Sequence, residues 1–317
     1  MTVDVHPIAA PWGRFALYSF LIDGSAVGGD LALVDTGVTA SAAGVPGELE
    51  RLGRRIEDVR WILLTHGHID HVGGAHALWE ATGRTARVVI SETDAHFLRS
   101  RRAHVEEALT LRGEFVDAVA LEARKTAETL DAISGEMEPT LTVSDGDVLD
   151  LGGVAVRVVA TPGHTPGAVA YVVGDPALDG HVFVGDAAQC YGAASGFPGY
   201  EDPDAYRASL ERVLALDPAH LYLGHPYRRQ DGTPFPVALD RDGAREALTA
   251  SLEREAQVRA AMEGHVASGS ESPYSPFEKV ARELGYSGDP TLEPSPFFTT
   301  LHGYTQSSGK APGKELP

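Results

Sequence analysis

The chain has 317 residues, 43% of them hydrophobic, and its 26 Lys and Arg residues stand against 45 Asp and Glu, which gives a net charge of −19 at pH 7. This hydrophobic fraction is close to the globular average and is sufficient for a sizeable core. An acidic surface without a basic stripe repels nucleic-acid phosphates and anionic lipid headgroups, so both kinds of partner are excluded. We therefore expect a small-molecule substrate.

The sequence indicates neither a targeting signal nor a disulfide. Residues 1–15 have no basic start followed by a long apolar run, which argues against a signal peptide. No stretch approaches the roughly 18 consecutive apolar residues of a membrane span. The single cysteine, Cys190, cannot form an internal disulfide, as is usual in a reducing cytosol. These features predict a soluble, cytoplasmic protein.

The first ninety residues predict strands separated by turns, followed by a helical segment. Apolar runs bounded by Gly, Pro or Asp predict strands over 14–22, 31–37, 59–64 and 86–90, with a helix over 73–82. Residues 92–138 are charged and alanine-rich, with Phe115, Val119 and Leu130 at roughly helical spacing. They predict two or three inserted helices that the core does not need and that form a lid or specificity wall.

The second half returns to strands and ends in helices. Strands are predicted over 154–160, 168–173, 181–185 and 220–224. A helix over 202–216 begins with Asp202 as N-cap and Pro203 at its first position. The rest predicts a charged helix over 241–265 and a short helix over 277–284. An aromatic patch follows at Phe297, Phe298 and Tyr304, and residues 305–317 predict a disordered tail.

Histidines and aspartates follow four of the predicted strands. The stretch "LLTHGHIDHVGG" (63–74) places three histidines and an aspartate in six positions, and single residues follow three later strands; the set is His66, His68, Asp70, His71, His164, Asp186 and His225. Imidazole and carboxylate groups together suit zinc, or iron or manganese. A closed structural zinc site would favour cysteine, and seven ligands exceed one tetrahedral ion. The pattern therefore indicates two metal ions per chain with room for a water.

These residues give the chain a resemblance to a known family. "THGHIDH" with a distal His, Asp and His resembles the metallo-β-lactamase superfamily, over residues 14 to about 226, and "LVDTG" (33–37) resembles its early strand. The resemblance implies an α/β fold, an αββα sandwich with the site at one edge. We expect a catalytic domain over 1–240, with 92–138 as its insertion, and a helical extension over 241–304 packed on it.

The resemblance also implies roles for the candidate ligands. His66, His68 and His164 would hold the first metal, whereas Asp70, His71 and His225 would hold the second, and Asp186 would bridge them. Asp35 would orient one of the histidines, although an ordinary turn aspartate is the alternative. Asp70 would also carry a proton to the leaving group.

The implied activity is that of a metal-dependent hydrolase. Water activated by the two metals would cleave a lactone or thioester of a small organic substrate. An iron-dependent dioxygenase with the same ligands, similar to persulfide dioxygenases, is the alternative. Related lactonases carry a tyrosine three residues after the bridging aspartate, where this chain has Gln189, which argues against that role. The candidate pocket residues are Gln189, Cys190, Tyr191, His96 and His104. A homodimer contact through the insertion is the alternative to its role as a lid.

Overall fold

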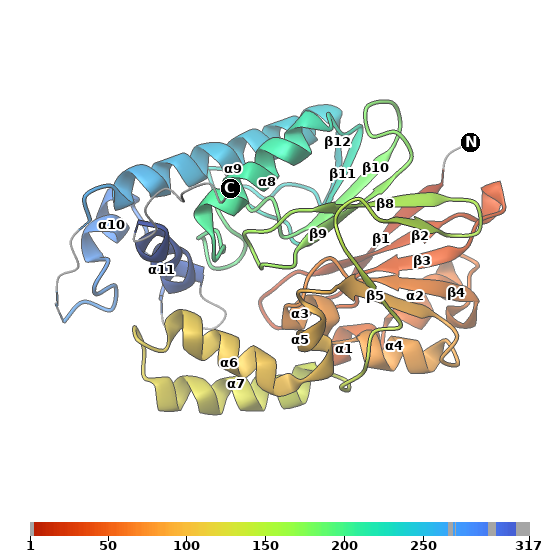
Figure 1. The fold of residues 1–317 in the computed structure, drawn as a ribbon, viewed down its shortest axis with the longest axis horizontal. Coiled ribbons are helices and arrows are strands. Elements are labelled where there is room, and N and C mark those ends of the chain that lie inside the picture. Colours follow the sequence, from red (N-terminus) through yellow and green to blue (C-terminus); the bar gives the residue numbers. More distant parts are fainter. Residues whose placement is uncertain (1–2, 266–268, 270, 291–295, 309–317) are drawn as a thin grey trace, which may run out of the picture.

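The computed structural model describes residues 3–265, 269, 271–290 and 296–308. Two six-stranded sheets lie face to face, with helices on their outer faces, which is the αββα sandwich expected from the sequence (Figure 1). The first sheet has the strands β1 (Asp4–Ala9), β2 (Tyr18–Asp23), β3 (Leu31–Val34), β4 (Val59–Leu63), β5 (Arg87–Ser91) and β6 (Leu141–Val143), in this order. The second runs from β12 (Ala238–Asp240) through β11 (His220–Leu223), β10 (His181–Gly185), β9 (Val169–Val173) and β8 (Ala155–Ala160) to β7 (Val148–Asp150).

The side chains of each central strand alternate between the core that lies between the two sheets and the core beneath the helices of its own sheet. Successive residues of a strand point to opposite faces of its sheet. In β2, Phe20 and Ile22 enter the core between the sheets, whereas Leu21 packs under the helices of the first sheet. In β10, Phe183 faces the other sheet, and Val182 enters the core beneath the helices of the second sheet. Both sheets are therefore apolar on both faces, as the predicted buried strands require.

Helices cover the outer face of each sheet. The first sheet carries α1 (Thr39–Ala42), α2 (Val45–Arg51), α3 (Ile69–Val72), α4 (Ala75–Ala81) and α5 (Ala95–Arg99), with the short 3-10 helices η1 (Ser25–Val27) and η2 (Ile56–Asp58) in its loops. The second sheet carries α8 (Pro203–Ala215) and α9 (Arg241–Met262). The last two helices, α10 (Glu278–Glu283) and α11 (Pro296–Ser308), contribute to the same core. None of the described helices is both long and apolar enough to cross a membrane.

Several boundaries differ from the sequence predictions. Residues 14–17 are not strand, because Trp12 and Phe15 form a bridge around a turn at Gly13. The strand predicted over 31–37 ends at Val34, since Asp35 has a left-handed φ of 57°. Strands β1, β6, β7 and β12 and helices α1 to α3 were not predicted. Edge strand β1 buries only Ile8 well, so its apolar signal is weak.

The insertion contains three helices, α5, α6 (Arg101–Arg112) and α7 (Ala118–Ala132), at the upper end of the predicted number. The expectation that the core does not need this segment is wrong for α5, because Ala95 and Leu98 belong to the core of the first sheet. The apolar spacing that predicted helices in this segment does not mark the buried face of α7. Val119 and Leu130 are exposed, and Leu121 is the buried residue of that helix's first turns.

The C-terminal extension is helical: its first helix, α9, packs on the second sheet beside α8, and α10 and α11 pack against these two helices. Phe297, Phe298 and Tyr304, predicted only as an aromatic patch, are buried on α11 in the same core as α8 and α9. The tail predicted to be disordered begins too early, since residues 305–308 form the end of α11. Residues 309–317 lie outside the described residues.

Candidate metal centre

Five chain segments meet at one edge of the sandwich. Neighbours β3 and β4 are parallel, as are β10 and β11, so the carboxyl ends of each pair lie at the same edge. Asp35 follows β3, the histidine motif follows β4, Asp186 follows β10, and His225 follows β11. His164 lies in the turn that joins β8 to β9. The topology therefore brings together all seven candidate ligands and Asp35, although they lie between positions 35 and 225 of the sequence.

The candidate ligands form overlapping groups. In each group the ligand atoms lie within 4.8 Å of one another, and the groups are His66 with His68 and His164, His66 with His71 and Asp186, and Asp70 with His71 and His225. Nδ1 of His68 and Nε2 of His164 lie 2.8 Å apart. Nε2 of His225 lies 3.2 Å from the Asp70 carboxylate.

Asp186 lies between these groups. Its Oδ1 is 3.4 Å from Nε2 of His71. Its Oδ2 is 3.5 Å from Nε2 of His164 and 3.4 Å from Nε2 of His225. One carboxylate therefore faces His164, a candidate ligand of the first metal, and His71 and His225, candidate ligands of the second. We call these two ligand sets the halves of the cluster, and a bridging ligand needs a position between them.

A hydrogen bond at the outer ring nitrogen fixes the orientation of most of these histidines. Nδ1 of His164 donates to the Gly199 carbonyl at 2.6 Å, and Nδ1 of His225 donates to the Ala16 carbonyl at 3.1 Å. Nδ1 of His66 lies 3.1 Å from the Thr65 hydroxyl. With Nδ1 engaged in this way, Nε2 is the nitrogen that can bind a metal.

Asp35 fixes the orientation of the His71 ring. Its Oδ2 accepts a hydrogen bond from Nδ1 of His71 at 2.9 Å, while Oδ1 accepts one from the Thr65 backbone N–H at 2.8 Å. The left-handed backbone of Asp35 is costly for a residue other than glycine, and such strain is typical of functional sites. Here it turns the carboxylate between the ends of β3 and β4, so Asp35 is more than an ordinary turn residue.

The buried atoms of the cluster fit metal ions. Nε2 of His66, Nε2 of His71 and Oδ1 of Asp186 are buried and have no hydrogen-bond partner within the described part of the chain. Buried polar atoms without partners are rare, and a bound ion is a common reason for them. Burial alone would raise the pKa of the Asp70 carboxyl, but the charges of His71 and His225 outweigh it and lower that pKa. Ionised carboxylates and inward Nε2 atoms are the donors that zinc prefers.

His68 has a different outer partner, which comes from the insertion. Its Nε2 lies 3.6 Å from the carboxylate of Glu107 on α6, and both groups lie close to Glu201. Burial, together with the Glu107 charge, raises the pKa of Glu201 to about 8. Burial would also raise the pKa of Glu107, but the His68 charge outweighs it and lowers the pKa of that carboxyl. No motif in the sequence pointed to either glutamate, because both approach the site through tertiary packing.

Glu107→Gln is expected to weaken metal binding or turnover by about 10–100-fold, the usual effect of losing a ligand's orienting partner. The amide has nearly the same shape but removes the charge that faces His68. Metal dissociation constants and kcat/KM should be measured together with Tm. Glu106→Gln is the matched control, because Glu106 is the preceding residue of α6 and pairs with Arg102 at the surface. An equal effect of both substitutions would show that Glu107 acts only through α6 stability.

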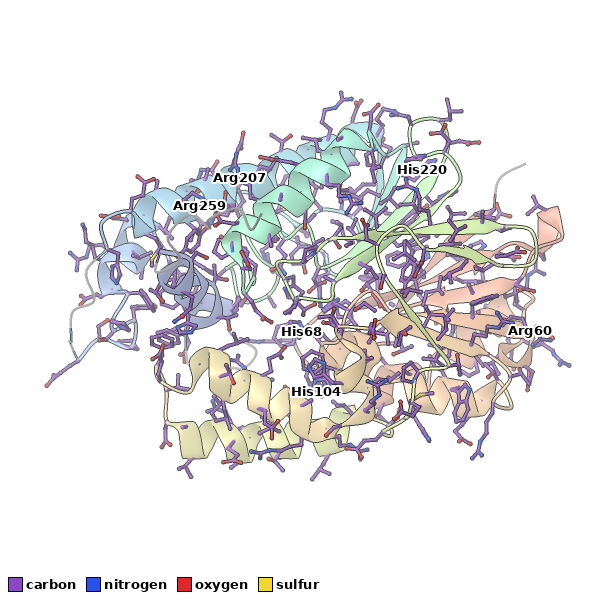
Figure 2. The ribbon with its side chains drawn as sticks, in the orientation of Figure 1. Arg60, His68, His104, Arg207, His220 and Arg259 are labelled. Atoms are coloured by element: carbon purple, nitrogen blue, oxygen red, sulfur yellow. The ribbon has the colours of Figure 1, made fainter. Side chains whose placement is uncertain are left out.

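A cavity of about 170 Å³ opens onto this centre. Gln189 and His104 contribute to its wall, and Figure 2 shows His68 and His104 in the same region. The prediction that His96 faces the pocket is wrong, because His96 is exposed and hydrogen-bonds to the Thr93 carbonyl. Residues of α6 and α7 also contribute to the wall, namely Glu107, Leu111, Arg112, Lys125 and Glu128.

Cys190 and Tyr191, also predicted at the pocket, do not line the metal-centre cavity. Cys190 is fully buried among apolar residues, with its thiol 3.4 Å from the Ala247 carbonyl, because a left-handed backbone turns it away from the metal centre. Tyr191 lies on a different cavity. The tyrosine at the metal centre is Tyr227, whose buried hydroxyl has no partner among the described residues. Its position two residues after His225 was the only sequence signal for it.

The fold and site together define a metal-binding hydrolase. The sequence model of the metallo-beta-lactamase superfamily matches residues 12–225, and the chain belongs to this superfamily. This confirms the resemblance seen in the histidine motif.

The chain is similar to individual members of this superfamily. It is 33% identical to a hydroxyacylglutathione hydrolase of Acidiphilium cryptum, over 77% of each chain. It is 32% identical to a hydroxyacylglutathione hydrolase of Ruegeria pomeroyi, over 72% of this chain and 69% of the other. The crystal structure of a metallo-beta-lactamase family protein from Thermus thermophilus has a TM-score of 0.68 at 23% identity and covers 96% of this chain and 94% of its own. The last similarity concerns the fold alone.

Proposed function

We propose that this protein is a dinuclear zinc hydrolase that cleaves an acyl thioester of a small organic thiol. The observation that carries the proposal is the position of Asp186 between two groups of inward-facing histidines. Each group offers three further ligands, so the cluster suits two ions. The names of the two similar bacterial proteins, both hydroxyacylglutathione hydrolases, favour a thioester over a lactone. Gln189, in place of the lactonase tyrosine, favours the same choice.

The candidate ligands would form two metal-binding sets that share Asp186. His66, His68 and His164 would hold one ion, Asp70, His71 and His225 the other, and Asp186 both. When bound, two such ions activate water and polarise the carbonyl of the substrate. Asp70 lies at the cavity wall and is ionised, so it can accept the proton of the attacking water and return it to the leaving group.

The cavity wall would select the acyl group. Apolar side chains line one part of the cavity, and binding sites for small molecules generally combine such surfaces with a few polar groups; here they are Trp12, Phe15, Ile69, Leu111 and Phe197. Gln189 holds the wall in place, because its side chain contacts the ring of His164 and the Gly199 backbone. A small acyl chain packed against these residues would leave its carbonyl beside the histidines.

Elemental analysis combined with a substrate panel tests the proposal. Purified protein is expected to contain about two zinc ions per chain, and to release free thiol from a hydroxyacylglutathione or an acyl-coenzyme A faster than it opens an acyl homoserine lactone. Removal of the metals with a chelator should abolish thiol release, and added zinc should restore it. One iron per chain with oxygen uptake would instead establish the dioxygenase alternative.

A further inference from the structure

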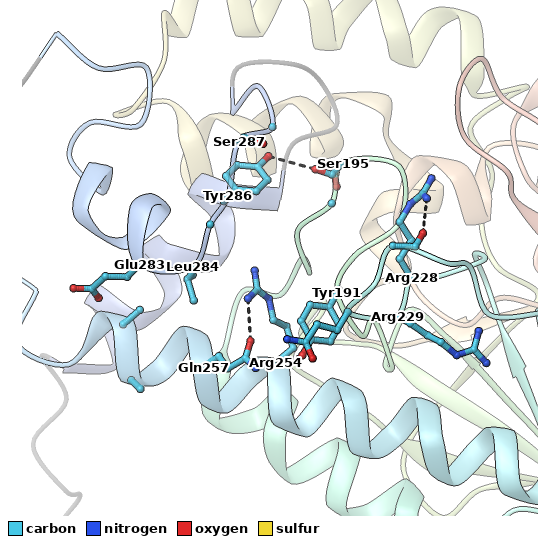
Figure 3. Close-up of a pocket in the computed structure, with 17 residues that line it drawn as sticks. Tyr191, Ser195, Arg228, Arg229, Arg254, Gln257, Glu283, Leu284, Tyr286 and Ser287 are labelled. Carbon is cyan, nitrogen blue, oxygen red and sulfur yellow. Dashed lines mark hydrogen bonds between the residues drawn. The ribbon is translucent and has the colours of Figure 1, made fainter.

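A second, larger cavity lies beside the metal centre. Its volume is about 880 Å³, and it is lined by α9, the end of α10 and the loops around Tyr191 and Arg228 (Figure 3). Ser195 lines both cavities, so one loop separates them. The Tyr286 hydroxyl donates to the Ser195 carbonyl at 3.4 Å, which ties this loop to the chain that follows α10. None of the metal-centre residues lines the second cavity.

Arg254 of α9 is the unusual residue of this cavity. It is only 6% exposed, yet it has no carboxylate within ion-pair distance among the described residues. Its Nη1 donates to the Gln257 side chain at 3.0 Å, and its buried Nε has no partner in the described ranges. The guanidinium carbon lies 5.1 Å from the centre of the Tyr191 ring. It also lies 5.6 Å from the centre of the Phe197 ring. A buried charge held by one amide and two aromatic faces is still incompletely satisfied, because its Nε–H has no acceptor among the residues described.

Two arginines close to Arg254 form ion pairs with a buried carboxylate. Glu255, the next residue of α9, is fully buried and pairs with Arg207 at 2.9 Å and with Arg259 at 2.7 Å. Arg254 points to the other side of the helix, where the cavity lies. Burial lowers the pKa of Arg254, but an arginine stays charged in proteins. The cavity therefore faces a positive charge that pairs with no carboxylate of the described residues.

A second arginine strengthens this charge. Arg228 also lines the cavity, and the bonds it makes go to two backbone carbonyls, from Nε to Ala193 at 3.3 Å and from Nη1 to Gly232 at 2.9 Å. The acidic lining residue, Glu283, lies 3.7 Å from Lys279. In a chain of net charge −19, a positive cavity is a local exception. Tyr191 and Tyr286 add aromatic surfaces to its wall.

We propose that this cavity is a binding site for an organic anion, a carboxylate or phosphate ester whose charged group pairs with Arg254, while Arg228 adds positive charge to the same cavity. Arginine binds both groups through paired N–H donors. The body of the ligand would pack against the rings of Tyr191 and Tyr286. The site is separate from the metal centre, so its occupancy does not depend on the proposed thioesterase activity. A ligand there would contact the loop that also forms the wall of the metal-centre cavity.

Calorimetric titration with phenyl phosphate tests the site, with phenol as the uncharged probe and ionic strength held constant. The full-length metal-loaded protein is expected to bind one phenyl phosphate at the cavity, and Arg254→Met should weaken this binding at least about tenfold. Methionine keeps the apolar stem against Tyr191. Arg245→Met is the matched control, because Arg245 lies on the same helix, pairs with Asp217 and is outside the cavity. Benzoate in place of phenyl phosphate distinguishes a carboxylate preference from a phosphate preference.

Two further measurements distinguish binding at this cavity from binding at the metal centre and from a purely structural role of Arg254. Phosphate esters also bind metal centres, so the titration is repeated with Asp186→Asn; binding at the second cavity should persist there, and its loss would overturn the proposal. Arg254→Met should also raise the Tm of the unliganded protein, because it removes an unpaired buried charge. Equal affinity of the Arg254→Met and wild-type proteins, or no saturable binding in the millimolar range, would also overturn it. Should Arg254→Met fail to fold, Arg228→Gln takes its place in the titration.

Discussion

Asp186→Asn is expected to remove at least one metal ion per chain and to lower thiol release more than about a hundredfold, since loss of an outer partner alone costs 10–100-fold. The physical reason is the position of the carboxylate. Its oxygens lie 3.4 to 3.5 Å from Nε2 of His71, His164 and His225, so the carboxylate faces candidate ligands of both metal ions. An asparagine would direct either an N–H group or a neutral oxygen at these positions.

Metal content by elemental analysis and thiol release at saturating zinc should be measured on the same preparation. Asp131→Asn is the control, because Asp131 lies exposed on α7 and carries the same change of charge. A variant of Asp186 that retains two zinc ions and normal turnover would show that Asp186 is not shared between two ions. A Tm close to that of the wild type after zinc loss would show that the cluster contributes little to stability.

The sandwich was predictable because its strands are long runs with a strong apolar signal. Runs such as 59–64 and 181–185 are buried on both faces, and their limits in the structure differ by one residue at most. The strands that escaped prediction lie at or near the sheet edges. Strand β1 is mostly exposed, and β6, β7 and β12 have three residues each, too few to show a period.

The candidate ligands could be predicted, but their surroundings could not. Residues His66 to His71 are close in sequence, so their clustering is visible without a structure. Glu107 reaches His68 only because α5 and α6 fold back over the motif, and Phe97 of α5 packs so closely on Gly67 that a Cβ there would lie 2.0 Å from the ring. Such contacts depend on tertiary packing, which has no local signature. The same holds for Arg254, whose missing carboxylate is a property of the folded chain.

Asp70→Asn is expected to lower turnover by about 10²–10⁴-fold, the range for loss of a general acid or base. Metal content should fall less than in Asp186→Asn, because Asp70 faces only one half of the cluster. Its carboxylate lies 3.2 Å from Nε2 of His225 and 4.0 Å from Nε2 of His71. Asparagine has nearly the same shape and keeps an oxygen for the metal, but it cannot carry a proton.

The choice of leaving group separates the two roles of Asp70. A thiolate leaves without much help, since a free thiol has a pKa near 8.5, whereas the alkoxide of an oxygen ester needs a proton as its bond breaks. If Asp70 donates that proton, Asp70→Asn should slow an alkyl oxygen ester more than the matching thioester with the same acyl group. Excess zinc should not restore either rate. An equal loss for both esters that added zinc repairs would mean that Asp70 is a ligand alone, and that the proton travels by another path.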